Sequence, residues 1–272
     1  MHHLEFEPPA PLQDAIKCFW YHETYYPEVD TEFEVVPDGY AEIIFYFGST
    51  CSILQDAAAL PLPSPFIMGL LNRPAHFITK GRFEIIGVRC YPWMVFDLLK
   101  LPSGKNGVQT FEHAITKLQP ALQQCVESGK TDDAIELLRN YFLHEHPQLN
   151  TDKVLLKAGT ALNTINGSIA VNKVAAAAHA TVRTLERKFR QSSGHSVKDV
   201  SALMRFEQVR NNLWLDPTLN LAGIAQELGY TDQSHLSREF KRFSNTTPAA
   251  FARKAKKDKL NIDADFVAFV QS

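Results

Sequence analysis

The C-terminal half of the chain contains an internal repeat, and this repeat limits the folds that the chain can adopt. The stretch VNKVAAAAHATVRTLERKFRQ (171–191) recurs as LAGIAQELGYTDQSHLSREFKRF (221–243). Matched positions hold apolar or small residues, namely Val174 and Ile224, Ala175 and Ala225, Ala178 and Leu228, Leu185 and Leu236, and Phe189 and Phe240. In each copy this spacing predicts a short helix, a tight turn, and a second helix that begins at a threonine cap, Thr181 or Thr231. The sequence therefore predicts two helix-turn-helix units.

Each predicted turn needs a residue that adopts a left-handed backbone conformation. Gly229 lies at this place in the second copy, and glycine adopts the conformation without steric cost. His179 lies there in the first copy, where it tolerates the conformation at some cost. We therefore expect the same turn in both copies.

The segment between the copies, SVKDVSALMRFEQVRNNLWLD (196–216), predicts a connecting helix. We expect this helix to end at Asp216, because Pro217 disfavours helix at the residue before it. Its apolar stripe comprises Val200, Leu203, Met204, Val209, Leu213 and Trp214, with Arg205 and Arg210 expected outside. A rigid connector can present both second helices to one face of a DNA duplex, about 34–36 Å apart.

Charge divides the chain in the same way as the repeat. Residues 1–150 contain 10 Lys and Arg against 19 Asp and Glu, whereas residues 151–260 contain 18 against 9. A basic segment favours a nucleic-acid partner, although it can also be a solvated face. We predict a β-rich domain at 1–150, a DNA-binding domain at 151–260 and an acidic tail at 261–272, which contains Asp263 and Asp265.

The first half predicts strands and tight turns. AEIIFYFG (41–48) and RFEIIGVRCY (82–91) are rich in β-branched and aromatic residues, and Pro37-Asp38-Gly39 predicts a turn with positive φ at the glycine. A small, cupin-like β-barrel or sandwich would enclose such strands, which makes the chain α+β. The stretch TDDAIELLRNYFLHEH (131–146) predicts a helix. Its apolar face, formed by Ala134, Leu137, Leu138 and Tyr141, should pack on the β domain or on a second copy in a homodimer.

Several classes of protein fit the sequence poorly. The N-terminus lacks the features of a signal peptide, and no apolar run reaches about 18 residues, so we expect a cytoplasmic protein without a membrane span. Cys18, Cys51, Cys90 and Cys125 are far apart, which favours reduced thiols. No histidine pattern predicts a metal site, and no nucleophile elbow or phosphate loop predicts catalysis. We therefore expect no metal, no cofactor and no enzymatic activity.

The C-terminal motifs resemble a known family. AHATVRTLERKFRQSSGHSVKDV, LAGIAQELGYTDQSHLSREFKRF and the closing TTPAAFARK are similar to the paired helix-turn-helix domain of the AraC/XylS transcription regulators, over roughly residues 153–255. Asn245 and Thr247 depart from the glycine and serine that are usual in the family, and both substitutions are conservative for a turn. FWYHE, VVPDGYAEIIFYFG and IIGVRCYPW are similar to uncharacterised N-terminal domains on one branch of the family.

The resemblance implies double-stranded DNA as the partner. Base-edge contacts are expected from Arg183, Glu186 and Arg187 in the first unit and from Gln233, Ser234 and Arg238 in the second. Arginine can bridge guanine, glutamine can pair with adenine, and glutamate can accept from a cytosine amino group. Phosphate contacts, which add affinity without sequence information, are expected from Lys188, Arg190, Thr231, Lys241 and Arg242. RNA polymerase becomes a further partner if the protein is an activator.

The first half would then sense a small-molecule effector or mediate dimerisation. A ligand pocket is expected among Trp20, Phe45, Phe47 and Trp93, with Glu42, His76 and Arg89 as polar groups. The same aromatic residues could instead form core, and the polar groups could form salt bridges. The alternative function is a small-molecule-binding or enzymatic barrel protein with a helical adaptor, but an enzyme has no need of paired recognition helices.

Overall fold

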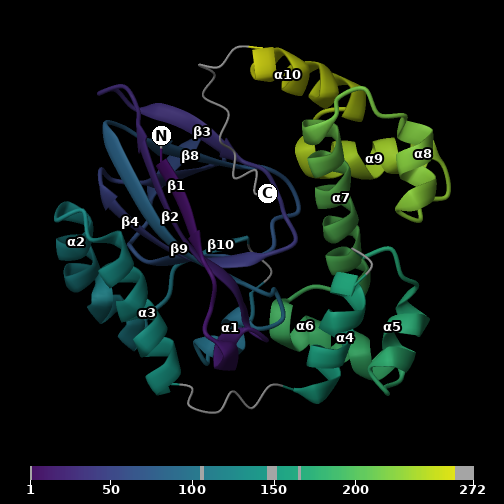
Figure 1. The fold of residues 1–272 in the computed structure, drawn as a ribbon, viewed down its shortest axis with the longest axis horizontal. Coiled ribbons are helices and arrows are strands. Elements are labelled where there is room, and N and C mark those ends of the chain that lie inside the picture. Colours follow the sequence, from purple (N-terminus) through teal and green to yellow (C-terminus); the bar gives the residue numbers. More distant parts are fainter. Residues whose placement is uncertain (1, 105–106, 146–151, 165–166, 261–272) are drawn as a thin grey trace.

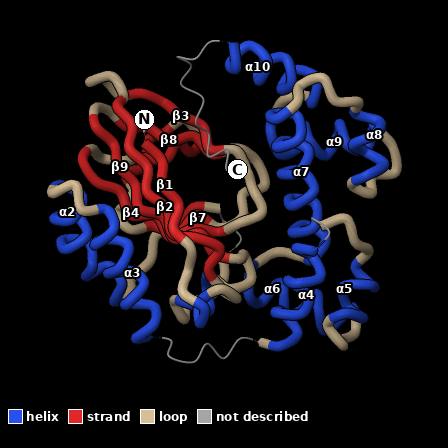
Figure 2. Tube along the Cα trace, in the orientation of Figure 1, coloured by secondary structure: helices blue, strands red, loops and turns tan. Residues whose placement is uncertain are grey.

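The computed structural model describes residues 2–104, 107–145, 152–164 and 167–260. Residues up to 145, the β-rich half, form strands with a few helices, and residues from 152, the helical half, form helices (Figure 1). The same division is visible when the chain is coloured by secondary structure (Figure 2). The α+β class expected from the sequence is confirmed.

The strands form two antiparallel sheets. The larger sheet has the order β1 (His2–Phe6), β2 (Ile16–Tyr25), β9 (Arg82–Cys90), β4 (Ala41–Gly48), β7 (Phe66–Met68), β10 (Val108–Gln109). The smaller sheet has the order β3 (Thr31–Val35), β8 (Ala75–Thr79), β5 (Ser52–Gln55), β6 (Ala58–Pro61). Among the residues that the structure describes, neither strand order closes on itself, so the β-rich half has two open sheets, which fits the sandwich form of the expected fold.

The larger sheet is buried on both faces. Trp20, Ile44 and Ile85 point into a core shared with the smaller sheet, where Phe33 stacks on Phe77 at 5.5 Å between ring centroids. The opposite face contacts α2 (Gln119–Glu127) and α3 (Thr131–Glu145). The β-rich half also contains three short helical segments, η1 (Ala10–Leu12), α1 (Val95–Leu98) and η2 (Ala114–Leu118), of which η2 leads directly into α2. The strand Ala41–Gly48 lies at the centre of this sheet, where both of its faces are covered, and this explains why it is apolar nearly throughout.

Helix α3 packs on the β-rich half, as its apolar face predicts. Ala134 and Leu138 are fully buried, and Leu137 and Tyr141 are partly buried against the same core. Phe142 contacts Phe19 of β2 at 6.4 Å between ring centroids. Of the two alternatives for the apolar face of α3, packing on the β domain or on a second copy of the chain, the structure shows the first.

The helical half is arranged around one long helix. Its elements are α4 (Lys153–Thr164), α5 (Val171–Ala177), α6 (Val182–Ser193), α7 (Val197–Leu215), α8 (Leu221–Glu227), α9 (Gln233–Ser244) and α10 (Pro248–Leu260). Helix α7 is the predicted connector, with α4, α5 and α6 at one end and α8, α9 and α10 at the other (Figure 1). It ends before Asp216, as Pro217 predicts. None of the helices in the described part of the chain is long and apolar enough to cross a membrane.

The connector differs from the expectation in its two arginines. Val200, Leu203, Val209 and Leu213 are buried as predicted, and Phe206 joins them. Arg205 and Arg210, however, do not lie outside. Arg210 is 5% exposed and donates to the carbonyl oxygen of Pro37 at 3.2 Å, and Arg205 contacts α9. The periodicity of one helix cannot predict partners contributed by distant segments.

The turn at Pro37-Asp38-Gly39 contacts the connector directly. A Cβ atom on Gly39 would lie 3.1 Å from Oε2 of Glu207 and 3.2 Å from Cγ of Met204. Gly39 does not have a positive φ, so the prediction that the turn requires a glycine for this backbone conformation is wrong. Close approach of α7 explains the residue instead.

Candidate nucleic-acid interface

The first helix-turn-helix unit, α5 and α6, has the predicted turn and cap. His179 has a φ of +52°, and the hydroxyl oxygen of Thr181 accepts a hydrogen bond from the Thr184 amide at 3.1 Å. Thr181 therefore satisfies one of the amides that the first turn of α6 leaves without a partner. Leu185 and Phe189 on the inner face of α6 are fully buried.

The second unit, α8 and α9, has the same turn with one extra residue. Gly229 has a φ of +71°, but α9 begins at Gln233 and its cap is Asp232, whose Oδ1 accepts from the His235 amide at 2.7 Å. The predicted cap at Thr231 is therefore wrong. The repeat shifts by one position within the turn, so Asp232 rather than Thr231 occupies the place of Thr181.

The two units are also similar at the C-terminal ends of their second helices, beyond the repeat found in the sequence. The second helices end at Gly194 and Asn245, with φ of +76° and +56°. Ser193 donates to the Phe189 carbonyl at 2.8 Å, and Ser244 donates to the Phe240 carbonyl at 2.7 Å. Asparagine tolerates the left-handed conformation, which explains why Asn245 can replace a glycine.

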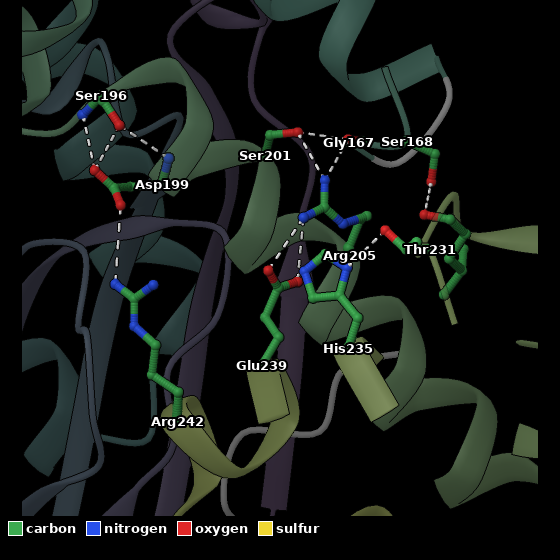
Figure 3. A network of polar contacts seen from close by, with 11 residues as sticks. Gly167, Ser168, Ser196, Asp199, Ser201, Arg205, Thr231, His235, Glu239 and Arg242 are labelled. Carbon is green, nitrogen blue, oxygen red and sulfur yellow. Dashed lines mark hydrogen bonds and ion pairs between the residues drawn. The ribbon is translucent and has the colours of Figure 1, made fainter. Parts of the chain in front are cut away.

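A partly buried arginine joins the connector to the second unit. Arg205 of α7 donates from Nη2 to both carboxylate oxygens of Glu239, at 3.2 and 3.1 Å, with side chains 14% and 11% exposed (Figure 3). Its Nη1 lies 3.4 Å from the Gly167 carbonyl oxygen, and its guanidinium lies 5.1 Å from the centre of the Tyr230 ring. Because Arg205 and Glu239 are both charged, the hydrogen bond between them is stronger than one between neutral groups. The sequence analysis missed Arg205, because an arginine at this position is also typical of an exposed helix face.

The outward faces of α6 and α9 carry most of the predicted base-reading residues. Arg183 and Arg187 on α6 and Gln233, Ser234 and Arg238 on α9 are exposed. Glu186 is only partly exposed, and its Oε2 lies 3.8 Å from Nε of Arg190. Both helices therefore combine a buried apolar side with an outer side of hydrogen-bonding groups.

The predicted phosphate contacts differ in their surroundings. Arg190, Thr231 and Lys241 are exposed. Arg242 is exposed too, with Nη2 3.8 Å from Oδ1 of Asp199 (Figure 3). Lys188 is partly buried and forms an ion pair with Asp152. Partial burial favours the neutral acid, but hydrogen bonds from Lys188 and two backbone amides lower the pKa of Asp152.

The residues of the predicted ligand pocket do not line one cavity. Trp20 belongs to the core between the sheets, whereas Phe45, Phe47 and Trp93 belong to the core on the opposite face. Neighbouring strands place Trp20 opposite Gly87 and Phe45 opposite Ile86, and successive residues of a strand point to opposite faces. These aromatic residues are therefore core residues, which was the alternative to a ligand pocket.

The polar groups of that predicted pocket are salt-bridged. Arg89 is 2% exposed and donates to Glu42 at 2.7 Å and to Asp38 at 3.0 Å. Burial opposes its charge, but these two carboxylates raise the pKa of Arg89. Nδ1 of His76 lies 2.7 Å from Glu32, at an exposed site on the other sheet. All four cysteines are free thiols, as expected.

Comparison with known families supports the reading of both halves. Residues 174–254 match the model of a helix-turn-helix domain. This match agrees with the resemblance of these residues to the paired helix-turn-helix domain of the AraC/XylS regulators. Residues 4–111 match a domain of unknown function, DUF6597, in agreement with the resemblance to uncharacterised N-terminal domains. This helix-turn-helix domain supports a DNA-binding role in transcription regulation.

Comparison with solved structures gives matches of low sequence identity. Unsaturated fatty acid-bound ToxT from Vibrio cholerae is 10% identical, with a TM-score of 0.49, covering 86% of this chain and 94% of ToxT. An AraC-type regulator from Chromobacterium violaceum is 19% identical, with a TM-score of 0.35, covering 38% of this chain and 91% of that protein. Comparison with curated proteins finds no match.

Proposed function

We propose that this regulator binds a specific DNA sequence by placing α6 and α9 in successive major grooves. The observation that carries the proposal is the pair of capped helices with exposed polar outer faces, joined by one continuous helix. Helix α7 has 19 residues, which corresponds to about 28 Å at 1.5 Å per residue. This length is close to one turn of the duplex, the separation that two units on one DNA face require.

In this proposal α6 and α9 read base edges through their outer residues. Arg183, Arg187 and Glu186 act from the first unit, and Gln233, Ser234 and Arg238 act from the second. The exposed Arg190, Thr231, Lys241 and Arg242 meet phosphates. Lys188 can join them only by giving up its ion pair with Asp152.

The β-rich half regulates the helical half in the same proposal, through an effector, a second copy of the chain, or both. Support comes from direct contacts: Trp93 lies 5.7 Å from Phe189 of α6 between ring centroids, and the Pro37 turn lies against α7. The proposed division into domains is 1–150 and 151–260, followed by a tail at 261–272 that lies outside the described residues. An activator of this design would also contact RNA polymerase.

A phasing experiment tests the two-groove geometry. A duplex selected by the full-length protein is compared with one in which five base pairs are inserted between the two halves of the footprint. Half a helical turn moves the second half-site to the opposite face, so affinity should fall to that of one half-site alone. Unchanged affinity after the insertion would show that the protein does not read two adjacent grooves. Titrations at several salt concentrations separate specific from non-specific binding.

A further inference from the structure

A cavity of about 240 Å³ lies where the β-rich half meets the connector helix. Its lining comes from three parts of the chain, namely Lys17, Tyr40 and Tyr91 from the β-rich half, Asn163 from α4, and Met204, Glu207 and Gln208 from α7. At about 30 Å³ per water molecule, this volume corresponds to roughly eight waters. It is large enough for a small metabolite and too small for a bulky one.

The lining of this cavity is polar and carries both signs of charge. Lys17 supplies an ammonium group, Glu207 supplies a carboxyl group, and Asn163 and Gln208 supply amides that can donate and accept. Tyr40 and Tyr91 form an aromatic side, with their ring centroids 6.2 Å apart. An apolar ligand would leave these polar groups without partners, which costs binding energy.

Glu207 is the acid in the lining of this cavity, and the Gly39 amide donates a hydrogen bond to it. The guanidinium groups of Arg210 and Arg89 lower the pKa of Glu207, but Arg89 binds Glu42 and Asp38, and Arg210 donates to the Pro37 carbonyl. Within the described part of the chain, no lysine or arginine nitrogen forms a salt bridge with Glu207. Burial and the neighbouring Asp38 raise the pKa of Glu207 to about 7. A cation at this carboxyl would relieve the unfavourable charge.

We propose that the cavity binds a small zwitterion of the α-amino acid class, whose ammonium group contacts Glu207 and whose carboxylate contacts Lys17. The two amides and the tyrosine rings take the polar and apolar parts of its side chain. The binding itself does not depend on the proposed function, but its effect on DNA does.

The position of the cavity connects a ligand with both helix-turn-helix units. Glu207 belongs to α7, which holds the second unit through Arg205. Tyr91 stacks on Trp93 with ring centroids 5.4 Å apart, and Trp93 contacts Phe189 of the first unit. A ligand between Tyr91 and Glu207 would therefore stabilise one arrangement of the β-rich half on the helical half.

Thermal unfolding of the full chain tests the proposal without DNA. Each of the twenty amino acids is added at 5 mM and pH 8, and any amino acid that raises the melting temperature is titrated by calorimetry. We expect at least one to bind with one-to-one stoichiometry, and its amidated derivative, which lacks the carboxylate, to bind at least ten-fold more weakly. If none of the twenty changes the melting temperature, the proposal is wrong.

Variants assign the binding to this cavity. Glu207→Gln and Lys17→Ala should each weaken the amino acid at least ten-fold, whereas the exposed Lys173→Ala on α5 should bind it as the unaltered protein does. Lys17 is exposed, so Lys17→Ala remains informative if Glu207→Gln fails to fold. Equal binding by Lys17→Ala and the unaltered protein would contradict the assignment. Failure to bind DNA, with amino acid binding intact, would count against the proposed function alone.

Discussion

The two helix-turn-helix units share one design but have different supports. Both have a left-handed residue in the turn, an N-capped second helix, and a serine that bonds back to a phenylalanine carbonyl. The first unit packs against the β-rich half through Trp93 and Phe189, and Ser103 donates to the Arg190 carbonyl at 3.4 Å. The second unit packs on the connector, where Phe206 contacts Phe240 and Phe243 and Arg205 pairs with Glu239.

This difference indicates how a signal from the β-rich half could reach DNA. A change at Trp93 acts directly on α6, whereas α9 responds through α7. At the end of α9, Asn245 lines an open groove of about 590 Å³ together with residues of the β-rich half. Because the first unit packs directly on Trp93, we expect it to be coupled to the β-rich half more closely than the second unit is.

The largest effect should come from removing the contact that supports the first unit alone. Trp93 is 2% exposed, and a Cβ on Gly159 of α4 would lie 2.2 Å from its ring. Trp93→Ala should cost about 3–5 kcal/mol of unfolding free energy, because a large aromatic side chain leaves a cavity. Hydrogen exchange should rise in α6 more than in α9. Equal increases in the two helices would show that the units are not supported differently.

The converse change removes the support of the second unit. Arg205→Ala leaves Glu239 mostly buried without its partner, which should cost about 3 kcal/mol. Hydrogen exchange should now rise in α9 and stay unchanged in α6. Arg253→Ala, at an exposed position on α10, serves as the control. An effect of Arg205→Ala confined to α6 would overturn the comparison.

Stability at the connector should depend on pH through Glu207. Its pKa of about 7 in the folded protein exceeds the ordinary value of 4.5, so the folded state keeps a proton that the unfolded chain loses as the pH rises between these values. The protein should therefore lose about 2–3 kcal/mol of unfolding free energy from this group between pH 5 and pH 8. Asp38, Arg89, Arg210 and Tyr40 face the same carboxyl.

Denaturant titrations of Glu207→Gln at both pH values isolate this contribution. The variant lacks the titrating group, so its stability relative to the unaltered protein should increase from pH 5 to pH 8. A constant difference would mean that Glu207 titrates normally.

The smallest effects should come from the two turns. Gly229 has positive φ, and a Cβ there would make only an ordinary contact, 3.7 Å from Cβ of Ser168, so Gly229→Ala should cost about 1 kcal/mol through backbone strain alone. His179→Gly should instead stabilise the first unit or leave it unchanged, since glycine removes the strain at this φ but adds chain entropy to the unfolded state. Thermal unfolding measures both. A stabilising Gly229→Ala would contradict the turn geometry.

The repeat allowed the sequence to predict what depends on local spacing. Two helix-turn-helix units, the connector and its end at Asp216 follow from periodicity, caps and proline. The exact cap of α9 did not, because Thr231 and Asp232 are adjacent and both can cap a helix. Arg205 and Gly39 could not be assigned either, since their roles depend on residues far away in the chain. The prediction of an aromatic pocket also depended on distant residues, because strand pairing decides which face of the sheet each ring occupies.

Base reading by the second unit can be measured directly. Arg238 is exposed near the start of α9, whereas Arg242 lies one turn later beside Asp199. Both variants are titrated at several salt concentrations with a selected duplex and with a scrambled one. Arg238→Ala should lose about 1–3 kcal/mol on the selected duplex only, and Arg242→Ala should weaken both duplexes and reduce the salt slope by about one. Equal losses for Arg238→Ala on the two duplexes would contradict the reading of DNA sequence by α9.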